Sequence, residues 1–338
     1  MELKQIGEFG FIHKISQGCV IRPDNIIRSI GDDAAAFTVP PGQVSLITTD
    51  LLVEGIHFIR KTITGFDLGY KSLAVNLSDI AAMGGKASEA FVSLGIPLKC
   101  PLEYLEAVYD GMKHLAARFN VNILGGDTTS SKNDLIINVA VHGTVASNKL
   151  LRRDAAQPGD IIFSTGYLGD SKAGLHLILN NLSVDSSAMQ VLYRAHVLPE
   201  PQLLEGRFLA DQSGIRAAID ISDGLSSDLG HIAEQSAVGA QIYVSEIPVS
   251  DSLKKFCAGF GFDPLEYALR GGEDYTLLCT AAAEKAEEIA QKFQDKFQRP
   301  LFRIGKTTAD NRLEAIFPDG TAKPISPRGW DHFKVEQG

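Results

Sequence analysis

Acidic residues in this chain recur where an apolar segment ends beside glycine, alanine, serine or threonine. Surface acids more often stand among lysines on a helix, as in residues 284–288. A carboxylate next to an apolar segment is costly to bury unless a cation or a hydrogen-bond donor compensates it. The acids in this setting occur in both halves of the chain: Asp32, Asp33, Asp50, Asp79, Asp127, Asp220, Asp223, Glu273 and Asp274. A fold for this sequence must give each of them a compensating partner.

These acids have two open readings. Aspartate is common in turns and at helix N-termini, and Asp223, which precedes Gly224 and a predicted helix, fits such a capping role. Alternatively, carboxylates that converge on one site repel one another, and a divalent cation removes the repulsion. Mg²⁺ prefers oxygen ligands and leaves positions for water and phosphate. On this second reading, all of these acids except Asp32 belong to one magnesium site.

The apolar pattern predicts helices and strands without strict alternation, which favours an α+β fold (mixed α/β) over a doubly wound sheet. Helices are expected at 67–83, 101–119, 170–179, 186–196, 201–212, 227–236 and 283–297. Strands are expected at 44–52, 91–96, 121–124, 135–145, 161–165, 217–221, 240–244, 275–280 and 301–305, with a hairpin over 313–325. We expect the strand at 121–124 to end in a glycine turn, Gly125–Thr129.

The chain's length of 338 residues suggests two domains. A polar stretch near 147–149 predicts the boundary and gives an N-terminal domain of residues 1–148 and a C-terminal domain of residues 149–338.

Composition excludes several classes of protein. The net charge of −9 argues against general affinity for nucleic acid. No apolar run approaches the roughly 18–20 residues of a membrane span, and no secretory signal is visible at the N-terminus. The four cysteines are widely separated and form no CxxC pair. We therefore expect buried free thiols in a cytoplasmic protein, with neither a membrane nor a nucleic acid as partner.

Common nucleotide and metal motifs are missing. The segment 84–87 lacks the spacing of a P-loop, and 166–169 is only part of a GxGxxG pattern. The eight histidines include no HExxH pair, so oxygen ligands favour Mg²⁺ or Mn²⁺ over zinc. Phosphates would then be held by metal ions, glycine-turn amides and a few basic groups such as Arg152 and Arg153. A solvated charge pair is the alternative role of these two arginines.

Seven motifs, in order along the chain, resemble the thiamine-monophosphate kinase family. In the N-terminal half they are Gly31–Ala35, Thr48–Asp50, Asn76–Gly84 and Gly125–Thr129. In the C-terminal half they are Asp220–Leu225, Gly271–Tyr275 and Gly329–Phe333. The resemblance covers essentially the whole chain. It implies the two-domain fold of the aminoimidazole-ribonucleotide-synthetase-like superfamily, in which an N-terminal sheet domain dimerises and ATP binds in a cleft.

The family pattern also implies roles for single residues. It assigns metal ions to Asp33, Thr48, Thr49, Asp50, Asp79, Asp127, Asp220 and Asp223, of which Asp50, Asp79, Asp127 and Asp220 are the predicted catalytic residues. It assigns ATP to Tyr109, Gly126, Asp127, Arg153 and Ser222. It assigns the substrate to His57, Glu273 and an aromatic residue near the C-terminus, which we take to be Trp330.

The implied reaction is the last step of thiamine diphosphate synthesis, in which thiamine monophosphate takes a phosphate from ATP. Its own phosphate oxygen would attack the γ-phosphorus in line. A phosphomonoester has a second pKa of about 6, so this nucleophile is already anionic and needs no strong base. Catalysis would consist of positioning and of charge neutralisation by several Mg²⁺ ions.

Two kinds of alternative function remain open. Other ATP-using enzymes of the superfamily carry cysteines that do not match here, because Cys19 lies in a different setting and the chain ends in Val335–Gly338. A non-enzymatic sensor of nucleotide or metal on the same scaffold would need fewer acids.

Overall fold

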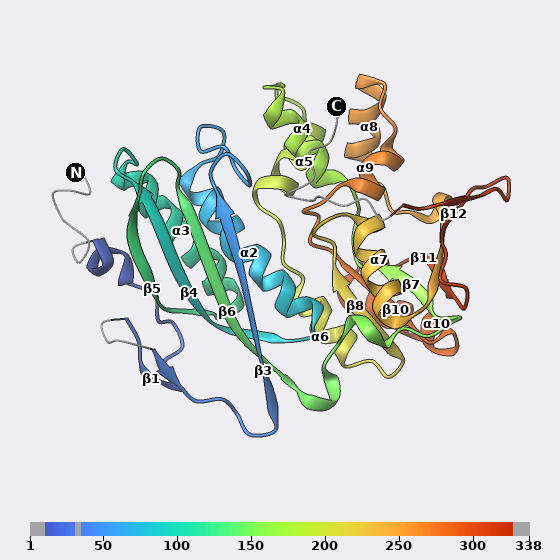
Figure 1. Ribbon diagram of the computed structural model, residues 1–338, viewed down its shortest axis with the longest axis horizontal. Coiled ribbons are helices and arrows are strands. Elements are labelled where there is room, and N and C mark those ends of the chain that lie inside the picture. The colour runs from blue at the N-terminus through green and yellow to red at the C-terminus, as the bar shows by residue number, and fades with distance from the viewer. Residues whose placement is uncertain (1–10, 31–34, 327–338) are drawn as a thin grey trace. The chain divides into compact units, whose positions relative to one another are not determined.

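The protein folds into two compact units (Figure 1). The first comprises residues 1–80 and 85–149, and the second comprises residues 81–84 and 150–338. The computed structural model describes residues 11–30 and 35–326. Within these ranges no helix is both long and apolar enough to cross a bilayer.

A four-stranded sheet forms the centre of the N-terminal unit. Its order is β3-β6-β4-β5, with β4 and β5 parallel and the other neighbours antiparallel. The strands are β3 (Gln43–Val53), β4 (Lys86–Pro97), β5 (Asn122–Ser131) and β6 (Ile136–Ala146), and a small ribbon joins β1 (Ile26–Arg28) to β2 (Ala36–Phe37). Alternate residues of β3 are buried or exposed, so one face of the sheet is covered.

Helices α2 (Gly65–Ala82) and α3 (Leu102–Phe119) lie along one face of this sheet (Figure 1). The Thr64 hydroxyl accepts a hydrogen bond from the Asp67 N–H at 3.0 Å and caps the start of α2. Glycine lets the two helices approach closely, because a Cβ on Gly69 would overlap the Val108 carbonyl. This packing fixes the position of α2, and with it Asp79 near its end.

A seven-stranded sheet organises the C-terminal unit, in the order β13-β12-β9-β11-β7-β10-β8. Its strands are β7 (Ile161–Ser164), β8 (Ile215–Asp220), β9 (Gly239–Tyr243), β10 (Leu277–Ala281), β11 (Phe302–Thr308), β12 (Leu313–Ile316) and β13 (Ala322–Pro324). Only the β9–β12 pair is parallel among these neighbours. Strands β12 and β13 form the hairpin that the sequence predicts around Pro318–Gly320.

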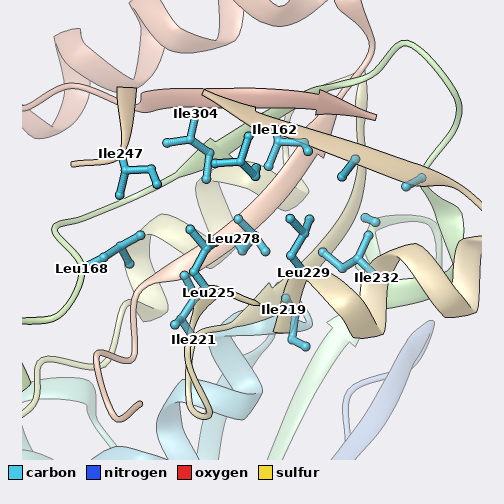
Figure 2. Packing of buried hydrophobic residues seen from close by; sticks show 14 of the residues in the cluster. Ile162, Leu168, Ile219, Ile221, Leu225, Leu229, Ile232, Ile247, Leu278 and Ile304 are labelled. Atoms are coloured by element: carbon cyan, nitrogen blue, oxygen red, sulfur yellow. The ribbon is translucent and has the colours of Figure 1, made fainter. Parts of the chain in front are cut away.

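Helix α7 (Leu225–Ser236) packs its apolar side on this sheet (Figure 2). Leu229 and Ile232 of α7 meet Ile219 of β8 and Leu278 of β10 in a cluster whose members are almost fully buried. Burying one such side chain contributes roughly 1.5–3 kcal/mol. The cluster therefore fixes the end of β8 and the turn before α7, which together carry three predicted site residues, Asp220, Ser222 and Asp223.

The other helices of this unit form two groups. Helices α4 (Asp170–Leu179), α5 (Ser187–Val197), α8 (Asp251–Phe260) and α9 (Pro264–Arg270) share a second apolar cluster that includes Leu177, Leu192 and Phe256. Helices α6 (Leu203–Ala210) and α10 (Ala283–Phe297) meet through Phe208 and Phe293, whose ring centroids are 5.6 Å apart.

The expected α+β class is confirmed, and most expected elements form within a few residues of their predicted limits. One expectation is wrong: Gly125–Thr129 is not a turn but part of β5, which continues to Ser131. Gly126 has φ +151° and lies so close to β4 that a Cβ would overlap the Val92 carbonyl. Here glycine permits close strand pairing, which the sequence pattern does not distinguish from a turn. All four cysteines are buried free thiols, as expected.

Candidate functional site

Two aspartates meet on the helix-covered side of the N-terminal sheet. Thr48 and Asp50 alternate along β3 with Ile47, Thr49 and Leu51, so they share the face that α2 covers. The Thr48 hydroxyl donates a hydrogen bond to a carboxylate oxygen of Asp79 on α2. The structure therefore brings together three predicted metal ligands, Thr48, Asp50 and Asp79.

The electrostatics of this group are unfavourable without a cation. Burial, and then the neighbouring charge of Asp79, raise the pKa of Asp50 from 3.8 to about 7. One turn before Asp79, the side-chain amide nitrogen of Asn76 donates to the Ser72 carbonyl at 3.1 Å. The amide oxygen of this fully buried Asn76 has no hydrogen-bond partner in the described ranges. Repelling carboxylates with further oxygen donors nearby suit a hard divalent cation.

Two other predicted ligands of this unit lie on the opposite side of the sheet. The hydroxyl of Thr49 accepts a hydrogen bond from the Asn138 side chain at 2.8 Å on that side. Asp127 is exposed on edge strand β5 and pairs with Ser93. Since β6 and β4 separate β3 from β5, Asp127 does not join Asp50 and Asp79 within one copy of this unit.

The predicted contacts His57 and Tyr109 have local partners. The ring nitrogen Nδ1 of His57 accepts a hydrogen bond from the Val53 N–H at 3.1 Å and so closes the turn after β3. Tyr109 of α3 is buried, and its ring packs edge-on against Phe11 at 6.1 Å. Burial raises the pKa of the Tyr109 hydroxyl. In this structure Tyr109 contributes to the core of the unit, and its contact with ATP stays a prediction.

A second group of acids occupies the turn between β8 and α7. Asp220 ends β8, Asp223 lies in the turn, and Asp228 is in the first turn of α7. A carboxylate oxygen of Asp228 accepts hydrogen bonds from the N–H groups of Asp223 at 3.1 Å and Gly224 at 3.0 Å. Burial and the charges of Asp220 and Asp223 raise the pKa of Asp228 to about 8.

Sequence reasoning missed Asp228 and His231. One ligand atom from each of Asp223, Asp228 and His231 lies within 4.8 Å of the others, which is compatible with a shared cation. Asp228 and His231 are three residues apart on α7, a spacing that places both side chains on one face of a helix. That spacing is a usable signal, although it is common on helices without metal.

Ser222 and Arg153, the predicted ATP contacts of the C-terminal unit, are on its surface or partly buried. Ser222 is partly buried in the acidic turn, and its carbonyl accepts a hydrogen bond from the Glu273 N–H at 2.8 Å. Arg153 is exposed. The neighbouring Arg152 pairs with Asp154 at 2.8 Å, which leaves the Arg153 guanidinium as the more available of the two for phosphate.

The acids of the motif Gly271–Tyr275 have different roles. Glu273 has a left-handed backbone, with φ +62°, and its side chain is 30% exposed. Asp274 accepts hydrogen bonds from the N–H groups of Gly169 at 2.7 Å and Ser171 at 3.2 Å, at the start of α4. These two contacts favour the capping reading for Asp274, and its inclusion in the magnesium site stays a prediction. Asp33 and Trp330 lie outside the described residues, as does Asp32.

Both halves of the chain match family models. Residues 31–145 match the AIR synthase related protein N-terminal domain, and residues 157–318 match the corresponding C-terminal domain. The chain is 36% identical over 331 residues to the thiamine-monophosphate kinase of Bacillus subtilis, a match that covers 97% of this chain and 99% of the relative. It is 38% identical over 329 residues to that of Escherichia coli K12, covering 97% and 98%.

Solved structures of thiamine-monophosphate kinases are also similar to this chain. The thiamine-monophosphate kinase of Stenotrophomonas maltophilia K279a superposes with a TM-score of 0.82 at 35% identity, covering 94% of this chain and 98% of the other. A structure described as AaThiL complexed with AMPPCP and TMP gives 0.78 at 33% identity, covering 98% and 99%. The hydrogenase maturation protein HypE in complex with ATP gives 0.77 at only 20% identity, so it is similar in fold alone.

Proposed function

The chain belongs to the thiamine-monophosphate kinase family of AIR synthase related proteins, and we infer that it phosphorylates thiamine monophosphate with ATP. The observation that carries this inference is similarity to thiamine-monophosphate kinases over nearly the full length of both chains. A relative of the same fold is described in complex with AMPPCP and TMP. AMPPCP is an analogue of ATP, and TMP abbreviates thiamine monophosphate.

The reaction requires precise positioning of the two substrates more than it requires proton transfer. The attacking phosphate oxygen of thiamine monophosphate is already anionic near neutral pH. The enzyme must hold this oxygen in line with the γ-phosphorus and must offset the repulsion between two phosphate-bearing anions. In a site lined by aspartates, cations held by these carboxylates would supply the neutralisation.

We propose that these cations are several Mg²⁺ ions. The residues present fit this group, because Thr48, Asp50 and Asp79 offer oxygen ligands and because Asp50 and Asp79 repel each other. When bound, Mg²⁺ supplies neutralisation of the charge on the phosphates. Asp220 and Asp223 are the proposed ligands of the C-terminal unit, and Asp33, Thr49 and Asp127 complete the proposed set.

The remaining assignments concern ATP and the substrate. We propose that Gly126, Asp127, Arg153, Ser222 and Tyr109 contact ATP and that His57, Glu273 and Trp330 contact thiamine monophosphate. Support for Glu273 is its partly exposed carboxylate, which can attract the cationic thiazolium ring of the substrate. Support for Arg153 is its exposed guanidinium, a group that suits bidentate contact with phosphate.

We also propose a homodimer in the cytoplasm. The side of the N-terminal sheet opposite α2 and α3 exposes Ile47 by 77% and Leu51 by 52%, and contiguous exposed apolar surface often marks a protein interface. Light scattering after size exclusion should therefore give twice the mass of the chain, and Leu51→Asp should shift the protein toward the monomer. The four free thiols suit the reducing conditions of the cytoplasm.

An assay of ADP release tests the function. With ATP, Mg²⁺ and thiamine monophosphate, the enzyme should release ADP and form thiamine diphosphate in equal amounts. Free thiamine and aminoimidazole ribonucleotide precursors serve as control substrates. Turnover of a control substrate, with none of thiamine monophosphate, would contradict the proposed function.

A further inference from the structure

The Glu273 carboxylate lies against a buried histidine that no motif in the sequence singles out. His196 is near the end of α5 and is only 6% exposed. Its ring nitrogen Nδ1 lies 3.3 Å from a carboxylate oxygen of Glu273 and 3.1 Å from the Ser171 hydroxyl of α4. A ring nitrogen that faces a carboxylate carries the proton and donates it, which fixes the orientation of the ring.

The backbone around Glu273 is fixed as well. Glu273 and Tyr275 both have left-handed backbone conformations, with φ of +62° and +50°. Residues other than glycine adopt this conformation only when their surroundings require it. Their N–H groups donate to the carbonyls of Ser222 at 2.8 Å and Ile221 at 2.9 Å. The segment that carries Glu273 is therefore tied to the acidic turn after β8.

Ser171 of α4 contacts both Asp274 and His196. Its N–H donates to Asp274, the residue after Glu273, while its hydroxyl meets Nδ1 of His196. The start of α4 thus holds the side chain of Asp274, next to Glu273, and also contacts the histidine that lies against the Glu273 carboxylate. Three segments distant in sequence converge on one partly exposed carboxylate, although a surface glutamate needs no such support.

We propose that His196 is a positioning residue that orients the Glu273 carboxylate toward the cationic thiamine moiety of the substrate. This inference rests on the proposed role of Glu273 in binding thiamine monophosphate. Holding a flexible glutamate side chain in one rotamer removes an entropic cost from substrate binding. His196 acts through Glu273, so its loss should affect the substrate that Glu273 contacts and spare ATP.

Steady-state kinetics of His196→Ala give the first test. We expect KM for thiamine monophosphate to rise about 10-fold, the effect of losing one hydrogen bond to a charged group, while KM for ATP stays near its wild-type value. In His196→Asn the side-chain amide nitrogen replaces Nδ1 as a donor, and this variant should recover most of the affinity. Failure of His196→Asn to improve on His196→Ala would contradict the role of this donor.

His176→Ala is the matched control. His176 lies on α4, contacts the Tyr267 hydroxyl at 3.1 Å through Nδ1 and packs beside Phe256, so its removal disturbs the same helical layer. It should lower thermal stability and leave both KM values unchanged. Equal effects of His176→Ala and His196→Ala on KM would reduce His196 to a structural residue and overturn the proposal.

A combined measurement separates this inference from the proposed function. In the substrate-free enzyme, the ¹⁵N resonance of His196 Nδ1 should show a bound proton, and it should shift in Glu273→Gln. In a Glu273→Ala background, His196→Ala should raise KM for thiamine monophosphate no further. If the wild-type enzyme turns over thiamine monophosphate but His196→Ala and Glu273→Ala raise its KM additively, the role of His196 is overturned and the kinase function stays intact. Absence of turnover in the wild type would instead remove the proposed function.

Discussion

Asp50 and Asp274 share a sequence setting and an elevated pKa but have different surroundings. Burial and the charge of Asp79 raise the pKa of Asp50 to about 7. Burial, and to a lesser degree the charges of Asp170 and Glu273, raise the pKa of Asp274 to about 8, although two backbone N–H groups of the α4 start donate to it. Both aspartates thus lie near other carboxylates, and Asp274 in addition accepts hydrogen bonds from a helix start. We interpret the repulsion at Asp50 as the mark of a cation site and the helix-start donors at Asp274 as the mark of a structural role.

The largest difference between the two should be in activity. Asp50→Asn removes one charge from the proposed cation site, and we expect kcat to fall by about 10²–10³, comparable to losing a group that stabilises transition-state charge. Assays at increasing Mg²⁺ measure whether excess metal restores the rate. Turnover near the wild-type rate at saturating Mg²⁺ would remove Asp50 from the cation site.

The next effect is on stability without metal. Because its pKa is raised in the folded state, Asp50 binds its proton more tightly there than in the unfolded chain. The wild type therefore loses stability as pH rises from about 4 to about 7, and Asp50→Asn does not share this loss. Above pH 7 the variant should be more stable by about 2–4 kcal/mol, from a pKa shift of about three units at 1.36 kcal/mol each. Urea denaturation in EDTA across this pH range measures the difference.

Mg²⁺ should reduce the difference in stability between Asp50→Asn and the wild type. A ligand that binds only the folded state stabilises it, and the ionised wild-type pair binds a cation better than Asp50→Asn does. A stability gap that stays the same in EDTA and in excess Mg²⁺ would mean that the cation does not bind at Asp50.

The smallest effects are expected at Asp274. Asp274→Asn should flatten the decline in stability between about pH 4 and pH 8, since its pKa is also raised, and Mg²⁺ should not alter this change. The amide oxygen still accepts one backbone hydrogen bond, so kcat should stay within about threefold of wild type, less than 1 kcal/mol in the barrier. A loss of activity that Mg²⁺ partly restores would place Asp274 among the cation ligands after all.

The sequence predicted the Asp50 group because its determinants are local. Alternation along β3 puts Thr48 and Asp50 on one face, and helical spacing puts Asp79 near the end of α2. The sequence left capping open for Asp274 but could not identify its partners, because Gly169 and Ser171 are more than one hundred residues away. Asp127 was expected beside Asp50, but it is separated because the extra residue in β5 near Leu124 and the sheet order decide its face.

In the C-terminal unit, too, local sequence predicts some site residues and distant contacts decide the others. The sequence identified Asp220, Asp223 and the helix that follows them, and the structure adds Asp228 and His231 of that helix, α7. His196 could not be found from sequence, since its role depends on packing between α4 and α5. Contacts between residues distant in the chain decide which acids have partners, and periodicity does not report those contacts.

Electron paramagnetic resonance with Mn²⁺ as the substitute for Mg²⁺ tests the central claim most directly, because it reports bound metal without requiring turnover. Titrations would compare the wild type, Asp50→Asn and Asp274→Asn in the presence of a non-hydrolysable ATP analogue. We predict that Asp50→Asn binds Mn²⁺ at least about 10-fold more weakly, comparable to losing a group that supports metal affinity, while Asp274→Asn binds as the wild type does. Equal Mn²⁺ binding by Asp50→Asn and the wild type would contradict this prediction.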